Sequence, residues 1–173
     1  MTEIALIAVI SVLIIKTFLV QPFLVSGDSM EPNFSDGNYL LVDELTYRFR
    51  EPERGEVIVF RYPENDSIFY IKRIVGLPGE TIKIKHGEVT VLNGDNQGGE
   101  IIKELYLPGS AKTSGEVEIK IKEGQYFVMG DNRLYSFDSR SWGTLDKRYL
   151  VGVVRFSLWP LGEARAVTAP VYQ

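Results

Sequence analysis

Two polar residues are the strongest candidates for chemistry in this chain of 173 residues: Ser29, in a loop-like stretch with apolar neighbours, and Lys72, in an apolar strand. Gly27 precedes the serine by two positions and lets a backbone or a substrate approach closely. Met30 and Phe34 add apolar surface after it, so the pattern favours a nucleophile beside a hydrophobic pocket. The competing interpretation is an ordinary loop serine in a stretch rich in Gly, Asp and Pro.

Lys72 and Arg73 stand side by side in an apolar strand predicted over Ser67–Val75. Neighbours on a strand point to opposite faces, so Lys72 shares a face with Tyr70 and Ile74. A buried lysine can lose its proton, whereas an arginine effectively cannot. Holding a lysine neutral at pH 7 costs roughly 4.6 kcal/mol, and full burial shifts a lysine pKa by about 3–5 units. A desolvated Lys72 could serve as a base, and the alternative is an edge-strand lysine that blocks aggregation.

A dense group of charged residues around Ser136 follows the strand predicted over Gln125–Met129. Such density after a strand indicates a hydrogen-bonded loop that could orient a base. The alternative is a surface turn whose salt bridges contribute little each. The group consists of Asp131, Arg133, Ser136, Asp138 and Arg140.

The composition narrows the possible chemistry. The net charge is −4 and no basic stripe is visible, so nucleic acid is not expected as a partner. The absence of cysteine excludes a thiol nucleophile, and the single histidine, His86, excludes a multi-histidine metal site. His86 precedes a turn glycine, where an exposed turn residue is the ordinary interpretation. We therefore expect neither a metal nor a cofactor.

An apolar run at the N-terminus, residues 4–20, contains Lys16 as its only charge. As a helix it would be roughly 26 Å long, close to the lower limit for crossing a bilayer. Lys16 lies near its end and can reach the interface. We predict a membrane anchor over residues 1–20; a cleaved signal peptide and a buried core helix are the alternatives.

After the apolar run, short strands separated by Gly-rich turns predict a mainly β fold of curled antiparallel sheets or an open barrel. We divide the chain into the anchor helix at 1–20, a catalytic β core at 21–79 and 126–173, and an inserted β-ribbon lobe at 80–125. Short charged hairpins and loops rich in Gly and Ser distinguish the lobe. The predicted strands are Tyr39–Val42, Glu56–Arg61, Ser67–Val75, Thr81–Lys85, Val89–Leu92, Val117–Ile121, Gln125–Met129 and Leu150–Leu158.

Taken together, these stretches closely resemble the bacterial type I signal (leader) peptidases in both order and spacing. The serine stretch is similar to the family's nucleophile segment, the lysine strand to its base segment, and the charged loop to its last conserved segment. The matching segments are Ser29–Pro32, Arg54–Phe60, Tyr70–Gly79, Gly130–Arg133 and Ser136–Gly143.

The resemblance implies a serine endopeptidase with a Ser–Lys dyad. Ser29 would attack the scissile carbonyl, with its backbone N–H in the oxyanion hole, and a neutral Lys72 would take the proton. Ser136 would hydrogen-bond the lysine and orient it. The implied supporting pairs are Asp131 with Arg73 and Asp138 with Arg140.

The resemblance also implies a membrane-bound enzyme that cleaves N-terminal signal peptides from exported preproteins after small residues, at A-x-A sites. Its partners would be secretory preproteins and the lipid bilayer. It would be a single-pass protein of the bacterial cytoplasmic membrane with its catalytic domain on the extracytoplasmic side. The implied substrate pocket consists of Phe23, Val25, Met30, Phe34, Leu40, Tyr70 and Ile71.

Two departures from the family pattern affect these expectations. Gly27 stands where some members have a serine that donates to the oxyanion, and Leu134-Tyr135 stand where the family often has Asp-Asn. A self-cleaving repressor-type Ser–Lys protease is an alternative, but the expected DNA-binding helix pair is missing from the pattern. A membrane-anchored β-rich binding module with an inactive site is another, and the intact candidate residues argue against it.

Overall fold

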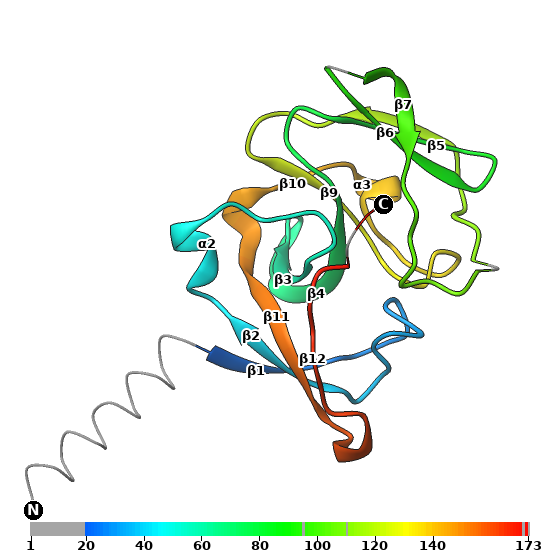
Figure 1. Ribbon diagram of the computed structural model, residues 1–173. Helices are drawn as coiled ribbons and strands as arrows, with labels where there is room; N and C mark the ends of the chain where they lie inside the picture. Colours follow the sequence, from blue (N-terminus) through cyan, green and yellow to red (C-terminus); the bar gives the residue numbers. More distant parts are fainter. Residues whose placement is uncertain (1–19, 95, 110, 171, 173) are drawn as a thin grey trace, which may run out of the picture.

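The computed structural model describes residues 20–94, 96–109, 111–170 and 172 of the chain, which fold mainly into β-strands (Figure 1). The helices are short: α2 covers Thr46–Phe49, α3 covers Ser139–Trp142, and two 3₁₀ turns, η1 and η2, cover Lys147–Tyr149 and Leu161–Glu163. The strands are β1 Val20–Leu24, β2 Tyr39–Asp43, β3 Val57–Tyr62, β4 Asn65–Gly76, β5 Thr81–Lys85, β6 Glu88–Asn93, β7 Asn96–Ile101, β8 Val117–Lys120, β9 Gln125–Met129, β10 Leu145–Asp146, β11 Leu150–Trp159 and β12 Arg165–Ala166.

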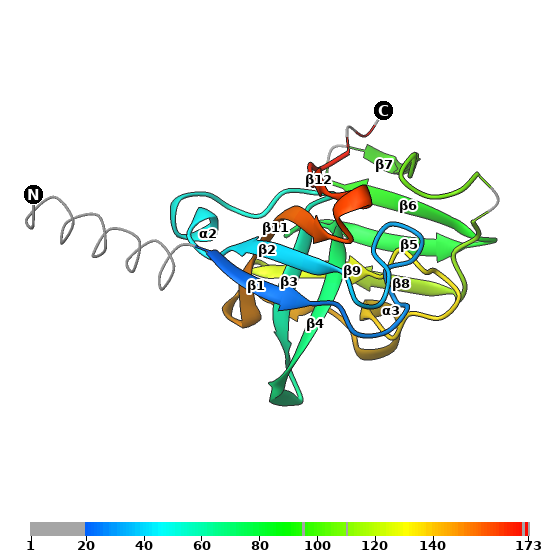
Figure 2. The same ribbon diagram turned by 90° about the horizontal axis from the view of Figure 1, so that it is seen from below.

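The strands form two antiparallel sheets, which confirms the predicted mainly β class. The larger sheet has the order β1-β2-β11-β3-β4-β9-β10, with β12 beside β11, and the smaller sheet has the order β7-β6-β5-β8. The larger sheet is open, because β1 and β10 form its two edges. Figure 2 shows the smaller sheet at one end of the larger one.

The core has apolar layers on both faces of the central strand β3. Alternate residues of this strand point to opposite faces: Val57 and Val59 pack in one buried cluster, and Ile58 and Phe60 pack in another. A strand covered on both sides is held firmly, and β3 pairs directly with β4, which carries the candidate lysine.

A third apolar cluster joins the two sheets. Val75 of β4 and Phe127 of β9 pack against Ile82 of β5 in the smaller sheet. Gly76 makes this approach possible, since a Cβ at that position would lie 2.7 Å from Cγ1 of Ile82. The two sheets therefore share one continuous apolar contact. The predicted division into a catalytic core and an inserted lobe at 80–125 stays a prediction.

The predicted membrane anchor falls on residues 1–20 and, apart from Val20 at the start of β1, lies outside the described residues. No helix in the described part of the chain has the length and apolar character needed to cross a membrane.

The sequence pattern does not predict four of the strands, β1, β7, β10 and β12. β1 continues the apolar N-terminal run, and the pattern of that run does not mark where the predicted anchor helix would stop. β7 contains Asn96 and a Gly-Gly pair, residues of types that are depleted in strands. β10 and β12 have two residues each and exist only through pairing with longer strands.

Candidate active site

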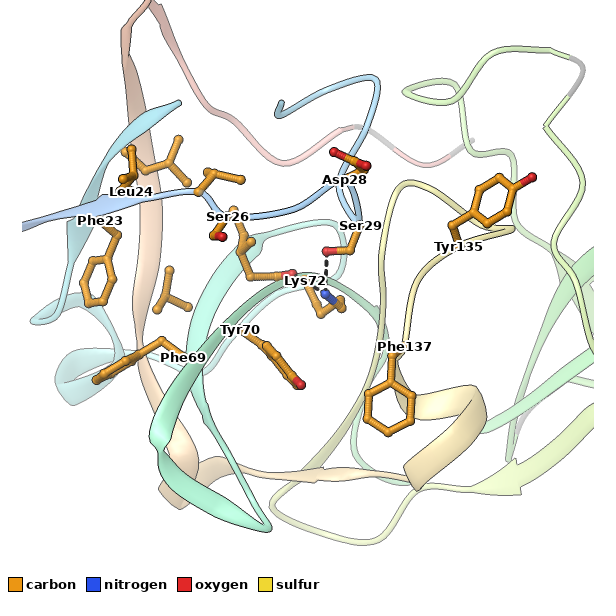
Figure 3. A pocket seen from close by; sticks show the side chains of 14 residues that line it. Phe23, Leu24, Ser26, Asp28, Ser29, Phe69, Tyr70, Lys72, Tyr135 and Phe137 are labelled. Carbon is orange, nitrogen blue, oxygen red and sulfur yellow. Dashed lines mark hydrogen bonds between the residues drawn. The ribbon is translucent and has the colours of Figure 1, made fainter. Parts of the chain in front are cut away.

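Ser29 and Lys72 meet in a cavity that both residues line, although they are far apart in sequence (Figure 3). Nζ of Lys72 donates a hydrogen bond to Oγ of Ser29 at 2.8 Å and another to the carbonyl oxygen of Ile71 at 2.9 Å. Ser29 lies in the loop after β1, and Lys72 lies within β4 opposite Ile58 of β3. The edge-strand interpretation of Lys72 is wrong, because β4 runs between β3 and β9.

Lys72 is 3 % exposed, and its neighbour Arg73 is 4 % exposed, so both charged groups of the strand are buried. Desolvation has the largest effect on the pKa of Lys72 and lowers it from 10.5 to about 8. The carboxylates of Asp138 and Asp131 favour the charged amine and oppose this shift without cancelling it. A substantial fraction of this amine is therefore neutral near pH 8. The strand thus supplies a buried amine that can accept a proton.

The loop that carries Ser29 is tied to the charged loop after β9. The backbone N–H of Asn132 donates to the carbonyl oxygen of Ser29 at 3.1 Å, and the Asn132 side chain donates to the carbonyl oxygen of Asp28 at 3.0 Å. Gly130 has no room for a side chain, since a Cβ there would overlap the Ser29 carbonyl oxygen and the Ser136 side chain. This close backbone contact fixes the position of the candidate nucleophile.

Arg73 and Asp131, which the resemblance pairs, form a buried bidentate ion pair. Nε and Nη2 of Arg73 donate to the two carboxylate oxygens at 2.8 and 2.6 Å. The amide of Asn33, in the Ser29 loop, also donates to Asp131 at 2.9 Å. The ion pair therefore links β4 and the charged loop to the segment that follows the serine.

Asp138 and Arg140 form the second expected pair, again with two hydrogen bonds, at 2.8 and 2.7 Å. Burial alone would raise the pKa of Asp138. The Arg140 guanidinium and the backbone N–H of Gly130 outweigh that effect and hold the pKa below its usual range. Asp138 is thus ionised beside the candidate base.

The position of Ser136 differs from the expectation. Its Oγ is buried and receives no hydrogen bond of ordinary geometry from another described residue, although it lies near enough to Asp138 to help lower the pKa of that carboxyl. The predicted hydrogen bond to Lys72 is therefore absent, because the lysine donates to Ser29 and to the Ile71 carbonyl instead.

The cavity beside Ser29 has a volume of about 360 Å³ and is lined by both apolar and polar side chains. Five of the seven expected pocket residues line it: Phe23, Val25, Leu40, Tyr70 and Ile71. Met30 and Phe34 do not, and this part of the prediction is wrong. They are 0 % and 2 % exposed and pack in the core beneath the serine loop, because the turn that follows Ser29 directs them inward.

Gly27 does not offer the backbone donor of an oxyanion site. Its N–H donates to the carboxylate of Asp36 at 2.8 Å, and its φ of 90° is one that glycine adopts readily. No hydrogen bond among the described residues uses the backbone N–H of Ser29. Of these two expected oxyanion positions, the geometry favours Ser29.

The structure also identifies site residues that the sequence did not single out. Glu104, which lies between β7 and β8, pairs with the buried Arg133 at 2.5 Å. Tyr135 and Phe137 line the cavity on the charged-loop side. An exposed aromatic residue within an otherwise polar loop would have been the only signal for them.

The described residues contain no group of three or more His, Asp or Glu side chains placed to hold a metal ion. A hydroxyl in contact with a buried amine, in a cavity lined in part by apolar side chains, is an arrangement suited to acyl transfer.

Comparisons with known proteins agree with this class. The family model described as signal peptidase, peptidase S26, matches residues 1–159. The chain is 36 % identical over 170 residues to signal peptidase I of Bacillus licheniformis, covering 92 % of this chain and 88 % of the relative. It is 35 % identical over 156 residues to signal peptidase I V of Bacillus subtilis, covering 86 % and 91 %.

The structure of this chain is similar to a crystal structure of a signal peptidase I from Enterococcus faecalis. The TM-score is 0.50 and the identity 27 %, covering 60 % of this chain and 97 % of that one. The chain therefore belongs to the signal peptidase family, peptidase S26. The predicted enzyme class, signal peptidase I, is confirmed.

Proposed function

We propose that this enzyme is a serine endopeptidase that removes signal peptides from secretory preproteins, with Ser29 as nucleophile and neutral Lys72 as general base. The observation that carries the proposal is the 2.8 Å contact between Oγ of Ser29 and a lysine that is 3 % exposed. Oγ attacks the scissile carbonyl carbon while the Ser29 proton moves to Nζ of Lys72. The lysine then protonates the leaving amine, and an acyl-enzyme is left at Ser29.

Deacylation reuses the same groups. A water molecule loses a proton to the again neutral Lys72, attacks the ester carbonyl and releases the signal peptide, and the proton returns to Oγ of Ser29. The backbone N–H of Ser29 stabilises the oxyanion. Asp131 with Arg73, and Asp138 with Arg140, hold the loop that supports the serine. Ser136 orients the lysine during the reaction, although the two side chains share no hydrogen bond in the free protein.

We also propose a preference for small residues before the cut, at A-x-A sites, as the resemblance to the family implies. Phe23, Leu40, Tyr70 and Ile71 supply apolar walls for these side chains. We further propose that residues 1–20 anchor the protein once in the bacterial cytoplasmic membrane, with the catalytic part on the extracytoplasmic side. A shared membrane would raise the effective concentration of a membrane-tethered preprotein.

The test is cleavage of a purified preprotein with an A-x-A site by the full chain. The wild-type enzyme should cut after the second alanine, and Ser29→Ala should not cut. Lys72→Met should lose about 10²–10⁴-fold in rate or more. Lys85→Met is the matched control, because Lys85 is an exposed lysine on β5. Normal cleavage by Lys72→Met would remove the proposed base.

A further inference from the structure

Three apolar side chains stand exposed on the charged loop beside the active site. Leu134 is 64 %, Tyr135 is 82 % and Phe137 is 50 % exposed. Exposed apolar groups gathered at the rim of a cavity are a feature of binding surfaces rather than of ordinary protein surface. Two of the three, Tyr135 and Phe137, line the cavity that contains Ser29 and Lys72, and Leu134 does not.

The backbone that presents these side chains is held in place on both sides. Arg133 donates to the Gly130 carbonyl oxygen at 3.0 Å, and Arg140 donates to the Arg133 carbonyl oxygen at 2.5 Å. The N–H of Tyr135 donates to the Asn132 carbonyl oxygen at 3.2 Å. The side chains are therefore exposed on a fixed loop, so a ligand would not have to order the loop when it binds.

The two rings lie on one side of the reacting pair. In Figure 3, Phe23 and Leu24 lie at one end of the cavity and Tyr135 and Phe137 at the other, with the contact between Ser29 and Lys72 between them. Lining side chains thus lie on both sides of the reacting pair, and we call these two sides the arms of the cavity. A peptide with its scissile carbonyl at Ser29 must send the residues before the cut along one arm and those after the cut along the other.

We infer that Tyr135 and Phe137 form the subsite for the first two residues after the cut, and that this subsite favours large apolar side chains there. The inference rests on the proposed function, which assigns the arm with Phe23 to the residues before the cut. Asp28 also lines the cavity and adds a negative charge at its mouth, which disfavours an acidic residue in the same place. The loop differs here from the family pattern, which often has Asp-Asn at Leu134-Tyr135, so the preference would distinguish this enzyme from other members.

The experiment uses the full chain and preproteins that are identical up to the cut but carry Leu-Leu or Ser-Ser immediately after it. The wild-type enzyme should cleave the leucine form about tenfold faster in kcat/KM, the scale of selectivity that one apolar pocket provides. Tyr135→Ala should reduce this ratio towards one. Because Tyr135 is 82 % exposed, the substitution should not disturb folding. Phe137→Ala should act in the same direction.

Leu134→Ala is the matched control, since it removes an equally apolar side chain from the same loop but outside the cavity, and it should keep the wild-type ratio. Equal cleavage of the two preproteins by the wild-type enzyme, or a ratio unchanged in Tyr135→Ala, would overturn the inference and leave the proposed function intact. A change in preference for the residue before the cut instead would overturn the assignment of the two arms. Failure of the wild-type enzyme to cleave either preprotein would overturn the proposed function and this inference with it.

Discussion

Nζ of Lys72 and Oγ of Ser29 lie 2.8 Å apart, and the lysine has a pKa of about 8 because it is desolvated. Only the neutral amine can accept the serine proton. We therefore expect kcat/KM to rise by about tenfold per pH unit below pH 8 and to level off above it. Preprotein cleavage measured from pH 6 to 10 checks this profile. A rate that is flat between pH 6 and 8 would contradict a lysine base.

The same shift affects stability. The folded-state pKa of Lys72 is lower than its ordinary value of 10.5, so between about pH 8 and 10.5 the unfolded state binds more protons than the folded state. The stability contribution of this residue should therefore increase as the pH rises through that range. Lys72→Met should show a smaller increase, measured by chemical denaturation at pH 8 and at pH 10. An identical pH dependence in wild type and variant would show that Lys72 is not desolvated.

Gly130 has no space for a methyl group between the Ser29 carbonyl and Ser136. Gly130→Ala should destabilise the fold by about 1–3 kcal/mol, as overpacking does, and should also reduce cleavage, because the candidate nucleophile must move. Gly162→Ala is the control, since nothing lies within 4 Å of the added Cβ there. The free energies of unfolding of the two variants test this, and a Gly130→Ala protein as stable and active as the control would show that the contact is loose.

Asp131 neutralises the buried guanidinium of Arg73, and the two side chains are 0 % and 5 % exposed. Asp131→Asn leaves that guanidinium without a carboxylate and should cost about 3–5 kcal/mol. The exposed pair of Lys83 and Glu118 offers a comparison: Glu118→Gln should change stability by less than about 1 kcal/mol. Urea denaturation of the two variants measures both effects, and equal losses would mean that burial does not decide the strength of the first pair.

Ser136 is buried without a hydrogen-bond partner of ordinary geometry among the described residues. Ser136→Ala should change the free energy of unfolding by less than about 1 kcal/mol, because no bond is lost, while cleavage should fall at least about tenfold if the hydroxyl orients Lys72 during the reaction. Ser141→Ala removes an exposed hydroxyl from the adjacent helix α3 and should change neither quantity. An undiminished rate in Ser136→Ala would exclude the orienting role.

Much of this site could be predicted from local patterns. The alternation of residues 67–75 indicates a strand, and an apolar strand with two adjacent charges indicates that one of them is buried. The structure buries both, because Arg73 has a carboxylate partner that the strand pattern does not reveal. The mainly β class likewise follows from short apolar runs and turn glycines.

Other features depend on tertiary contacts that no local pattern contains. Met30 and Phe34 lie close to Ser29 in sequence, but a turn directs their side chains into the core, and periodicity does not describe turns. Arg133 lies in the loop after β9 of the larger sheet, and its partner Glu104 lies in the connection between β7 and β8 of the smaller sheet. Neither residue alone therefore indicates the other. The absence of a contact between Ser136 and Lys72 is a matter of side-chain direction within one loop.

The shared apolar contact between the two sheets limits how far this enzyme can be shortened. A minimal version without residues 80–125 would expose Val75, Phe127 and Met129 to water and would leave the Arg133 cation without its anion. Such a truncation would have to supply a substitute apolar cover and a replacement carboxylate before the serine could keep its position.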